Sequence, residues 1–423
     1  FCVGFAPFIM AGMSLLLPIF LLLLSLSGCE CAEGGGDGSP QKEYPIIFAA
    51  GDSTFDVGFK IGEMTKSRTL KYLNDTKGHW DQIESCLNSN PDTKKQANVY
   101  LRNLLHYSPH IEGELRGLAL GLGISLRSLL LLNADNELSS LCSLATVDHC
   151  SDIMVKMSDG RGVEAHNEDN DESLASSYIV VQQVSHPEEP FRGEGRYEVP
   201  MESSRFVSFN YPGQLSGVAF GFSTHGFGFT CNSEFPKAMS LTGVPINGLS
   251  RALFDVGSID DAVLALTTAN VATGFSINLF EFGETSQQRI VSVEVAPGGL
   301  SSVRVIQNDS KYFRANQYRS LNVEQTADAS SIHRLQREQE MPSPLTFEKE
   351  GVEGVVKGMF DILGDTADAK YPIYRDGKEP DTGVITLATA LFNLKDAVME
   401  VYTDNPKTAA PVHSFNMRTG ELM

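Results

Sequence analysis

The sequence predicts an α+β fold, because two stretches of the chain carry different hydrophobic patterns. Between residues 58 and 140, apolar residues recur every three or four positions, as in the run 111–120, which predicts a mainly helical portion. From residue 150 onward, short runs of β-branched and aromatic residues are separated by Gly, Asp, Asn and Pro, which predicts strands. A helical portion followed by strands and further helices is typical of sheets layered between helices.

Local patterns predict the individual elements. Residues 44–50 form an apolar strand at the start of the globular body, ahead of the helical portion. Ser258 opens a capping-box pattern that begins a helix over 258–266, and a further helix follows at 351–363. Residues 384–402 are typical of a closing hairpin.

The first 43 residues are expected to be separate from this body. Their apolar run has signal-peptide length and ends in small residues, so we interpret residues 1–32 as a cleaved secretory signal and 33–43 as a polar, Gly-rich linker. A retained membrane anchor and a lipoprotein cleavage site at Cys29 are the alternatives, although the run is short for a membrane span. The mature protein is then expected to be soluble and secreted or lumenal, with glycosylation sequons at Asn74 and Asn308.

Composition excludes some classes of function. The formal charge of -20, from 33 Lys and Arg against 53 Asp and Glu, excludes nucleic acid as the partner. The cysteines beyond the first 43 residues are too few for a disulfide scaffold and lack zinc spacing, so we expect no cofactor, no metal and at most one disulfide. These cysteines are Cys86, Cys142, Cys150 and Cys231.

The most informative segment surrounds Cys150. Asp159 and Gly160 form a strong two-residue turn signal between two strand-like runs. A hairpin with this turn would place Cys150 opposite Asp169, within side-chain reach. A turn of another length would change this pairing.

A thiol beside a buried carboxylate is a poor nucleophile without help from a base or a cation. If the bond between His149 and Cys150 is cut, the new α-amino group has a pKa of about 7.7 to 8.0 and can take the thiol proton. Other interpretations stay open from the residues alone. Cys150 could be a small buried core residue, His166 or His149 could form a papain-like pair with it, and Asp169 could only cap a turn.

Several motifs that occur in one order along the chain are more informative than these single residues. The chain resembles the isopenicillin-N acyltransferase family of N-terminal nucleophile hydrolases from about residue 46 to its end, including the helical stretch with Asn133 and Glu137. Within this family it is most similar to the branch that contains insect N-β-alanyl-dopamine hydrolase. The motifs are Cys150 followed by 166–169, 226–233, 242–245, 250–253, 316–318, 330–334 and 405–407.

The resemblance implies a four-layer αββα sandwich whose precursor cleaves itself between His149 and Cys150. A mainly helical α chain, 44–149, and a catalytic β chain, 150–423, would stay associated in one unit, and a dimer stays open. Carried over by position, Cys150 is the nucleophile and Asp169 steadies its amino group. Asn232 donates to the oxyanion, and Arg334 is the cation near the thiol.

Two departures from the family pattern concern processing and substrate. The bulky His149 stands before the cut where relatives often have Gly, which could slow cleavage. Glu168 stands where the acyltransferase has an aromatic residue, so His166, Asn167 and Glu168 are candidates for a polar amine-binding pocket.

We therefore expect a self-processing cysteine amide hydrolase that acts on a small-molecule amide, of the β-alanyl type, through a thioester acyl-enzyme. An acyltransferase and a lipid-amide or peptide amidase with the same nucleophile are the enzymatic alternatives. An uncleaved binding protein on the same fold is the alternative from another class.

Overall fold

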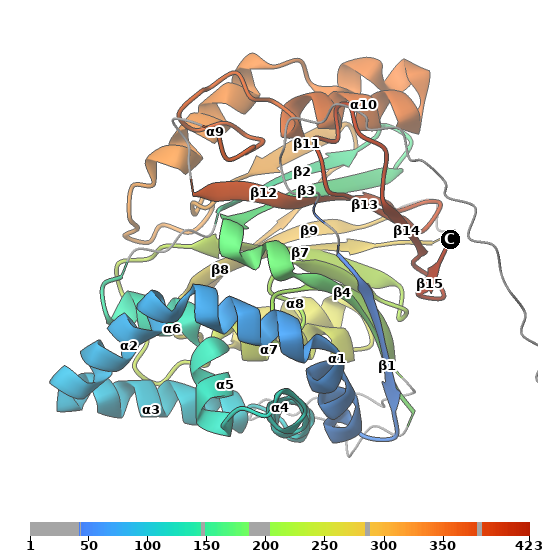
Figure 1. Ribbon diagram of the computed structural model, residues 1–423. Helices are drawn as coiled ribbons and strands as arrows, with labels where there is room; N and C mark the ends of the chain where they lie inside the picture. Colours follow the sequence, from blue (N-terminus) through green and yellow to red (C-terminus); the bar gives the residue numbers. More distant parts are fainter. Residues whose placement is uncertain (1–41, 43, 145–148, 186–203, 284–287, 379–382) are drawn as a thin grey trace, which may run out of the picture. The chain divides into compact units, whose positions relative to one another are not determined.

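Two stacked β-sheets lie between two layers of helices in the computed structural model (Figure 1). The structure describes residues 42, 44–144, 149–185, 204–283, 288–378 and 383–423. The expected signal 1–32, with Cys29, and all of the linker 33–43 except Lys42 lie outside these residues. The four layers confirm the predicted αββα class, and residues 41–423 form one unit.

In the described part of the chain, α1 to α6 precede the scissile region, as the hydrophobic periodicity predicts. They cover the outer face of the larger sheet together with α7 and α8, while α9 and α10 cover the smaller sheet (Figure 1). The α-helices are α1 Thr54–Asp75, α2 Lys77–Ser89, α3 Pro91–Leu105, α4 Pro109–Leu122, α5 Leu126–Leu132, α6 Asp135–Leu141, α7 Ile246–Ala252, α8 Ile259–Thr268, α9 Ala329–Glu340 and α10 Val352–Leu363. Short 3-10 helices are η1 Glu172–Ser176, η2 Leu253–Asp255 and η3 Pro344–Glu350.

The larger sheet has the order β1-β4-β5-β6-β7-β8-β9-β10, and the smaller sheet has the order β11-β2-β3-β12-β13-β14-β15. β1 pairs with β4 in parallel, so the first strand of the helical portion is built into a sheet of the later portion. The strands are β1 Ile46–Gly51, β2 His149–Lys156, β3 Gly162–Asp171, β4 Tyr178–Val184, β5 Ser204–Asn210, β6 Phe220–Ser223, β7 Phe227–Glu234, β8 Gly274–Glu281, β9 Ile290–Ala296, β10 Leu300–Val305, β11 Ser310–Arg314, β12 Val384–Asn393, β13 Val398–Tyr402, β14 His413–Asn416 and β15 Glu421–Leu422.

Local signals placed several elements correctly. Ser258 accepts a hydrogen bond from the Asp261 N–H and caps α8, as its capping pattern predicts. The expected strand at 44–50 corresponds to β1, and the expected hairpin over 384–402 is the pair of β12 and β13. These predictions are confirmed because each rests on contacts within a few residues.

The predicted two-residue turn between β2 and β3 is wrong by one residue. Lys156 pairs with Gly162, and beyond this pair Met157 N–H donates to the Arg161 carbonyl at 2.8 Å, so the loop has three residues. Gly160 takes a φ of 90°, the left-handed position of such a loop. Consequently Cys150 lies opposite Glu168, and Asp169 lies opposite His149.

Helices α1 and α4 pack closely because glycines face their contact. A Cβ atom on Gly117 would lie 2.0 Å from the Phe55 carbonyl oxygen, and one on Gly58 would lie 2.2 Å from the Glu114 carbonyl oxygen. This contact fixes the N-terminal half of α1 against α4, and the C-terminal half of the same helix supplies Tyr72 to the cavity described below.

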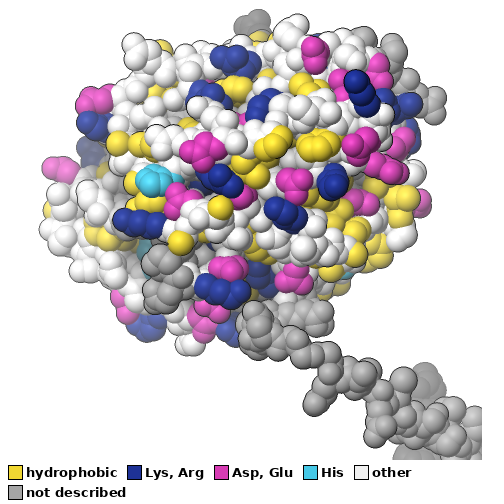
Figure 2. Space-filling model, turned by 90° about the horizontal axis from the view of Figure 1, so that it is seen from above, with side chains coloured by type: hydrophobic (Ala, Val, Ile, Leu, Met, Phe, Trp, Pro, Cys, Tyr) yellow, Lys and Arg dark blue, Asp and Glu magenta, His cyan; other side chains and the backbone are white. Residues whose placement is uncertain are grey.

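The outer face over α9 and α10 carries acidic and basic side chains side by side (Figure 2). No single helix of the described residues is long and apolar enough to cross a membrane; α4 and α5 meet this test only as a pair, bent by 111°. Asn74 and Asn308, the sequon residues, are both exposed, and their glycosylation stays a prediction.

Candidate active site

Cys150 lies at the start of β2, and its thiol opens on a cavity of about 390 Å³. The strand begins at His149, so the predicted scissile bond lies within the described part of the chain. Elements from both halves of the chain enclose the cavity. Its lining residues are Tyr72, Asp75, Thr76, His79, Leu132, Asp135, Asn136, Ser139, Cys150, Glu168, Asn170, Asp171, Ser173, Leu174, Tyr211, Gln214, Val218, Cys231, Ser233, Ile246 and Asn247.

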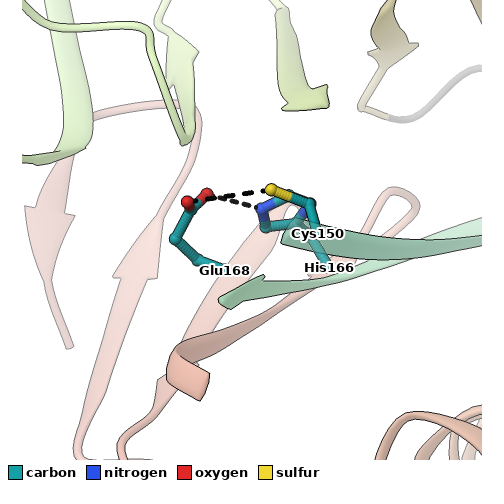
Figure 3. A group of neighbouring side chains, drawn as sticks. All are labelled: Cys150, His166 and Glu168. Carbon is teal, nitrogen blue, oxygen red and sulfur yellow. Dashed lines mark hydrogen bonds and ion pairs between the residues drawn. The ribbon is translucent and has the colours of Figure 1, made fainter. Parts of the chain in front are cut away.

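A chain of ionisable groups continues from the thiol along the inner face of the hairpin, between the two sheets. Cys150 Sγ lies 3.8 Å from Glu168 Oε1, and Glu168 Oε2 lies 2.9 Å from His166 Nε2 (Figure 3). His166 Nδ1 lies 2.9 Å from Asp152 Oδ1. Tyr211 O–H also donates to Glu168 Oε1. The strand period of two places these groups on one face, since they occupy alternate positions of β2 and β3.

Charge on this face is fixed by the two carboxylates around His166. Burial alone would lower the pKa of His166, but Asp152 and Glu168 outweigh burial and raise it to about 10. The imidazole is therefore protonated at neutral pH and donates on both sides. Burial opposes ionisation of Asp152, but His166 and further donors hold the pKa of Asp152 below its usual value.

Glu164 lies on the same strand and face but has a different state. Burial and the nearby charge of Asp152 raise its pKa well above the usual value, which favours the protonated carboxyl group. Glu164 therefore differs from Glu168, four residues further along β3, whose carboxylate accepts hydrogen bonds from His166 and Tyr211.

The outer face of the same hairpin holds Asp169 between guanidinium groups. Thr386 Oγ1 donates to Asp169 Oδ1 at 2.6 Å, and Arg375 Nε lies 3.7 Å from Asp169 Oδ2. Burial raises the pKa of Asp169 to about 6, although Arg375 and Arg334 act in the opposite direction. The observed pairing of β2 with β3 is one residue away from the predicted pairing. Asp169 therefore faces away from the thiol, contrary to the predicted apposition with Cys150.

The main chain of Cys150 is held by Asn316 and Arg334. Cys150 N–H donates to Asn316 Oδ1 at 2.9 Å, and Arg334 Nη1 donates to the Cys150 carbonyl at 2.5 Å. Arg334 Nη2 donates to the same Asn316 Oδ1 at 2.8 Å, and Asn316 Nδ2 donates to the Ser233 carbonyl, which fixes the amide orientation. Burial and Arg375 lower the pKa of Arg334 to about 10, so it keeps its charge at neutral pH.

Asn316 is the site residue that the sequence analysis did not assign. It lies within the motif 316–318 that carried part of the resemblance, so its presence there was a usable signal. In this structure the Cys150 N–H donates to Asn316. The expected role of Asp169, to steady the amino group of Cys150, stays a prediction.

Asn232 lies behind the cavity wall. Its Nδ2 donates to Asp152 Oδ2 at 2.5 Å and its Oδ1 accepts from Asn278 Nδ2 at 3.0 Å, whereas its neighbours Cys231 and Ser233 line the cavity. Its predicted donation to an oxyanion would need this amide to turn from Asp152, and that role stays a prediction.

Of the three residues expected in an amine pocket, Glu168 alone is part of the cavity lining. His166 is fully buried behind it, and Asn167 points to the outer face, where its Nδ2 donates to the Leu363 and Ile373 carbonyls. The placement of Asn167 in the pocket is therefore wrong, because strand alternation turns it toward α10.

His149 is mostly buried on the other side of the predicted scissile bond. Its Nδ1 lies 3.9 Å from Asp328 Oδ2. Burial, with Arg334 and Arg375 nearby, lowers the pKa of His149 to about 3, so the imidazole is neutral.

Cys150, His166 and Glu168 also offer three atoms within 4.8 Å of one another, a spacing that a metal ion could use. Both ring nitrogens of His166 are occupied by carboxylate oxygens at 2.9 Å, however. A protonated imidazole has no lone pair for a metal, so we interpret this group as a hydrogen-bonded chain.

The described cysteines divide into a disulfide and two buried thiols. Cys86 in α2 is bonded to Cys142 after α6, whereas Cys150 and Cys231 are buried thiols. This confirms the expectation of at most one disulfide, and it ties the segment before the predicted cut to the helical layer.

Comparison with known proteins places the chain in a family. The sequence profile described as acyl-coenzyme A:6-aminopenicillanic acid acyl-transferase matches residues 155–408, more than half of the chain. The beta-alanyl-dopamine/carcinine hydrolase of Drosophila melanogaster is 27% identical over 393 residues, covering 88% of this chain and 95% of that protein.

Two solved structures of mutant conjugated bile acid hydrolase from Clostridium perfringens are also similar. One has a TM-score of 0.39 at 12% identity and covers 65% of this chain and 95% of that chain. The other has a TM-score of 0.37 at 12% identity and covers 64% and 94%. By the profile match, the chain belongs to the acyl-coenzyme A:6-aminopenicillanic acid acyl-transferase family of N-terminal nucleophile hydrolases, enzymes that act on amide bonds.

Proposed function

We propose that this enzyme cleaves itself before Cys150 and then hydrolyses amides between a small, positively charged acyl group and an amine. The observation that carries the proposal is the charge of the cavity at the thiol. Its described lining includes four carboxylate residues and neither Lys nor Arg. The carboxylates belong to Asp75, Asp135, Glu168 and Asp171.

The balance of charge in the cavity favours a cation. His79 is the residue of the described lining whose side chain can be positive, and its pKa is raised by its hydrogen bond to Asp135, which places its charge beside that carboxylate. Asp75 forms an ion pair with Lys71, which lies outside the lining, and Asp171 accepts a hydrogen bond from the Ser173 N–H. A β-alanyl amide carries an ammonium group two carbons from its carbonyl, and such a group gains from nearby carboxylates. The name of the Drosophila relative agrees with this substrate class.

Self-cleavage would convert Cys150 into its own base. The thiol attacks the His149 carbonyl, the acyl group shifts from nitrogen to sulfur, and water hydrolyses the thioester. The new α-amino group has an ordinary pKa of about 7.7 to 8.0 and accepts the thiol proton in later cycles. Asn316 Oδ1, which already binds this nitrogen, would keep one N–H direction fixed.

Turnover would use the same thiol. The thiolate attacks the substrate carbonyl, the amine leaves, and water resolves the acyl-enzyme; an amine in place of water would give acyl transfer. Donors to the oxyanion are typically worth about 3 to 4 kcal/mol each. Asn232 is the proposed side-chain donor, after its amide turns from Asp152.

A matched substrate pair tests the charge argument. We expect purified protein to release dopamine from β-alanyl-dopamine with a kcat/KM at least about 100-fold above that for propionyl-dopamine, which lacks only the ammonium group. β-Alanyl-histamine should behave like the first compound, and a long-chain acyl amide like the second. Equal release from the charged and neutral pair, or release from the long-chain amide alone, would contradict the proposal.

The processing step has its own test. A denaturing gel of active protein should give two bands, and N-terminal sequencing of the larger fragment should read Cys-Ser-Asp-Ile-Met-Val. Active protein in a single full-length band would refute self-cleavage and favour a chain that keeps its nucleophile internal.

A further inference from the structure

The uncut chain lacks the base that the mature enzyme would use. Before cleavage the nitrogen of Cys150 is an amide, and its N–H donates to Asn316 Oδ1 at 2.9 Å. An amide nitrogen has no basic lone pair, because resonance delocalises it into the carbonyl. The thiol proton must therefore go to another group in the first, self-cleaving reaction.

Glu168 is placed to receive this proton. It lies opposite Cys150 in the β2–β3 pairing, with Oε1 at 3.8 Å from Sγ, and it is 2% exposed. The His166 imidazolium donates to its other oxygen at 2.9 Å, and Tyr211 O–H donates to Oε1. Both donors favour the ionised carboxylate, which is the form that accepts a proton.

We propose that Glu168 takes the thiol proton of Cys150 during self-cleavage and returns it to the Cys150 nitrogen as the peptide bond breaks. This inference rests on the proposed self-processing. It assigns to Glu168 a catalytic role in maturation that the α-amino group takes over once it is free.

The steps balance without a co-reactant other than water. The S–H proton moves to Glu168 Oε1 while Sγ bonds to the His149 carbonyl carbon. The tetrahedral intermediate then collapses: its C–N bond breaks, and the Glu168 carboxylic acid protonates the departing nitrogen of Cys150. Water hydrolyses the thioester, leaving the His149 carboxyl group, the free thiol and the free amine.

The other titratable groups near the thiol are less suited to this task. His166 is already protonated, with its pKa raised to about 10. His149 is a weak base, with its pKa lowered to about 3 by burial. Asp169 points to the outer face of the hairpin, where it binds Thr386. Among the described residues, the ionisable groups that act on Glu168 or feel its charge include Cys150, His166, Asp169, Tyr211 and Tyr44.

A pair of Glu→Gln variants tests the role. In full-length precursor, Glu168→Gln should slow self-cleavage at least about 100-fold, the usual contribution of a positioned general base. Glu164→Gln is the matched control, because Glu164 is buried on the same strand and face, its raised pKa favours the protonated form that Gln resembles, and the carboxylate beside the thiol is that of Glu168. It should cleave within about threefold of wild type.

The pH profile separates a proton acceptor from a merely structural group. Wild-type cleavage should change little between about pH 6 and 8, since the base is internal. Cleavage of Glu168→Gln should rise about tenfold per pH unit, because it then depends on the thiolate fraction of a thiol with an ordinary pKa of about 8.5. A flat profile in Glu168→Gln, or cleavage at the wild-type rate, would overturn the inference.

A second variant keeps the test valid if the first folds poorly. Glu168→Ala leaves room at the cavity wall for a small carboxylate, so formate should raise its cleavage rate at least about tenfold, whereas chloride at equal ionic strength should not. Equal effects of the two salts would count against Glu168. Wild-type chain that never cleaves would instead refute the proposed function itself, so the two failures are distinguishable.

Discussion

The two faces of the β2–β3 hairpin surround one cysteine with opposite kinds of group. On the inner face, Glu168 and Asp152 enclose the cation of His166. On the outer face, the guanidinium groups of Arg334 and Arg375 act on the carboxylate of Asp169. The alternation of a strand produces this separation, since neighbouring residues point to opposite faces.

The difference separates proton chemistry from positioning. The inner face contacts the side chain of Cys150, through Glu168 at 3.8 Å from the thiol. The outer face holds its main chain, through Arg334, which donates to both the Cys150 carbonyl and Asn316. Changes on the inner face should therefore alter the rate and pH dependence of bond cleavage, and changes on the outer face should mainly alter geometry and stability.

The largest effect is expected from replacing Cys150, which groups on both faces of the hairpin contact. Cys150→Ala should leave a single uncut chain and reduce amide turnover by at least about 10⁴-fold, because the attacking atom is gone. Gel analysis and a dopamine-release assay measure the two effects. Cys231→Ala is the matched control, since Cys231 is also a buried thiol in the described cavity lining. Cys231→Ala should process and turn over normally. If Cys231→Ala abolished both activities and Cys150→Ala did not, the nucleophile would be Cys231 on β7 and not Cys150 on β2.

The sequence predicts where this hairpin turns, but it does not predict which residues pair far from the turn. The Asp159-Gly160 signal locates the turn correctly, but a left-handed Gly160 suits both a two-residue and a three-residue loop. The loop length decides the register, and one residue of slip exchanges the faces of a strand. Local residues therefore predict where the hairpin turns and leave open whether Glu168 or Asp169 meets the thiol.

The remaining site contacts are long-range and have no local pattern. Asn316 reaches the Cys150 nitrogen across 166 residues, and Tyr211 reaches Glu168 across 43. Such contacts depend on how β11 and the end of β5 pack beside the hairpin. Family motifs mark these positions, as 316–318 did, but a motif does not state which atom contacts which.

The two faces should also differ in how stability depends on pH. His166 has a pKa raised to about 10, so its contribution to the free energy of unfolding is full below about pH 6.5 and is lost as pH rises through 10. Asp169 has a pKa raised to about 6, so it favours the folded state at about pH 4 and loses that contribution as pH rises through 6.

Denaturant unfolding of His166→Gln and Asp169→Asn against wild type measures these differences. Relative to Asp169→Asn, wild type should lose about 3 kcal/mol between about pH 4 and 7. Relative to His166→Gln, wild type should lose several kcal/mol between about pH 6.5 and 10. Parallel curves for the two variants would mean that the faces are not electrostatically distinct.

The smallest expected effect comes from a change to the inner face alone. Tyr211→Phe removes the hydroxyl that donates to Glu168, and a lost hydrogen bond of this kind typically costs about 1.5 to 3 kcal/mol when the acceptor is charged. Partial compensation by His166 should limit the slowing of self-cleavage to about tenfold. The acid limb of the cleavage profile should move to higher pH, because ionised Glu168 loses a donor.

Tyr100→Phe is the matched control for this variant, because the Tyr100 hydroxyl donates to the Ser240 carbonyl away from the cavity lining. It should change the free energy of unfolding by a similar small amount without moving the acid limb. If Tyr211→Phe left the acid limb in place or slowed cleavage as much as Glu168→Gln, the hydroxyl would act on the thiol by another route. If both Phe variants shifted the limb equally, its position would not report the ionisation of Glu168.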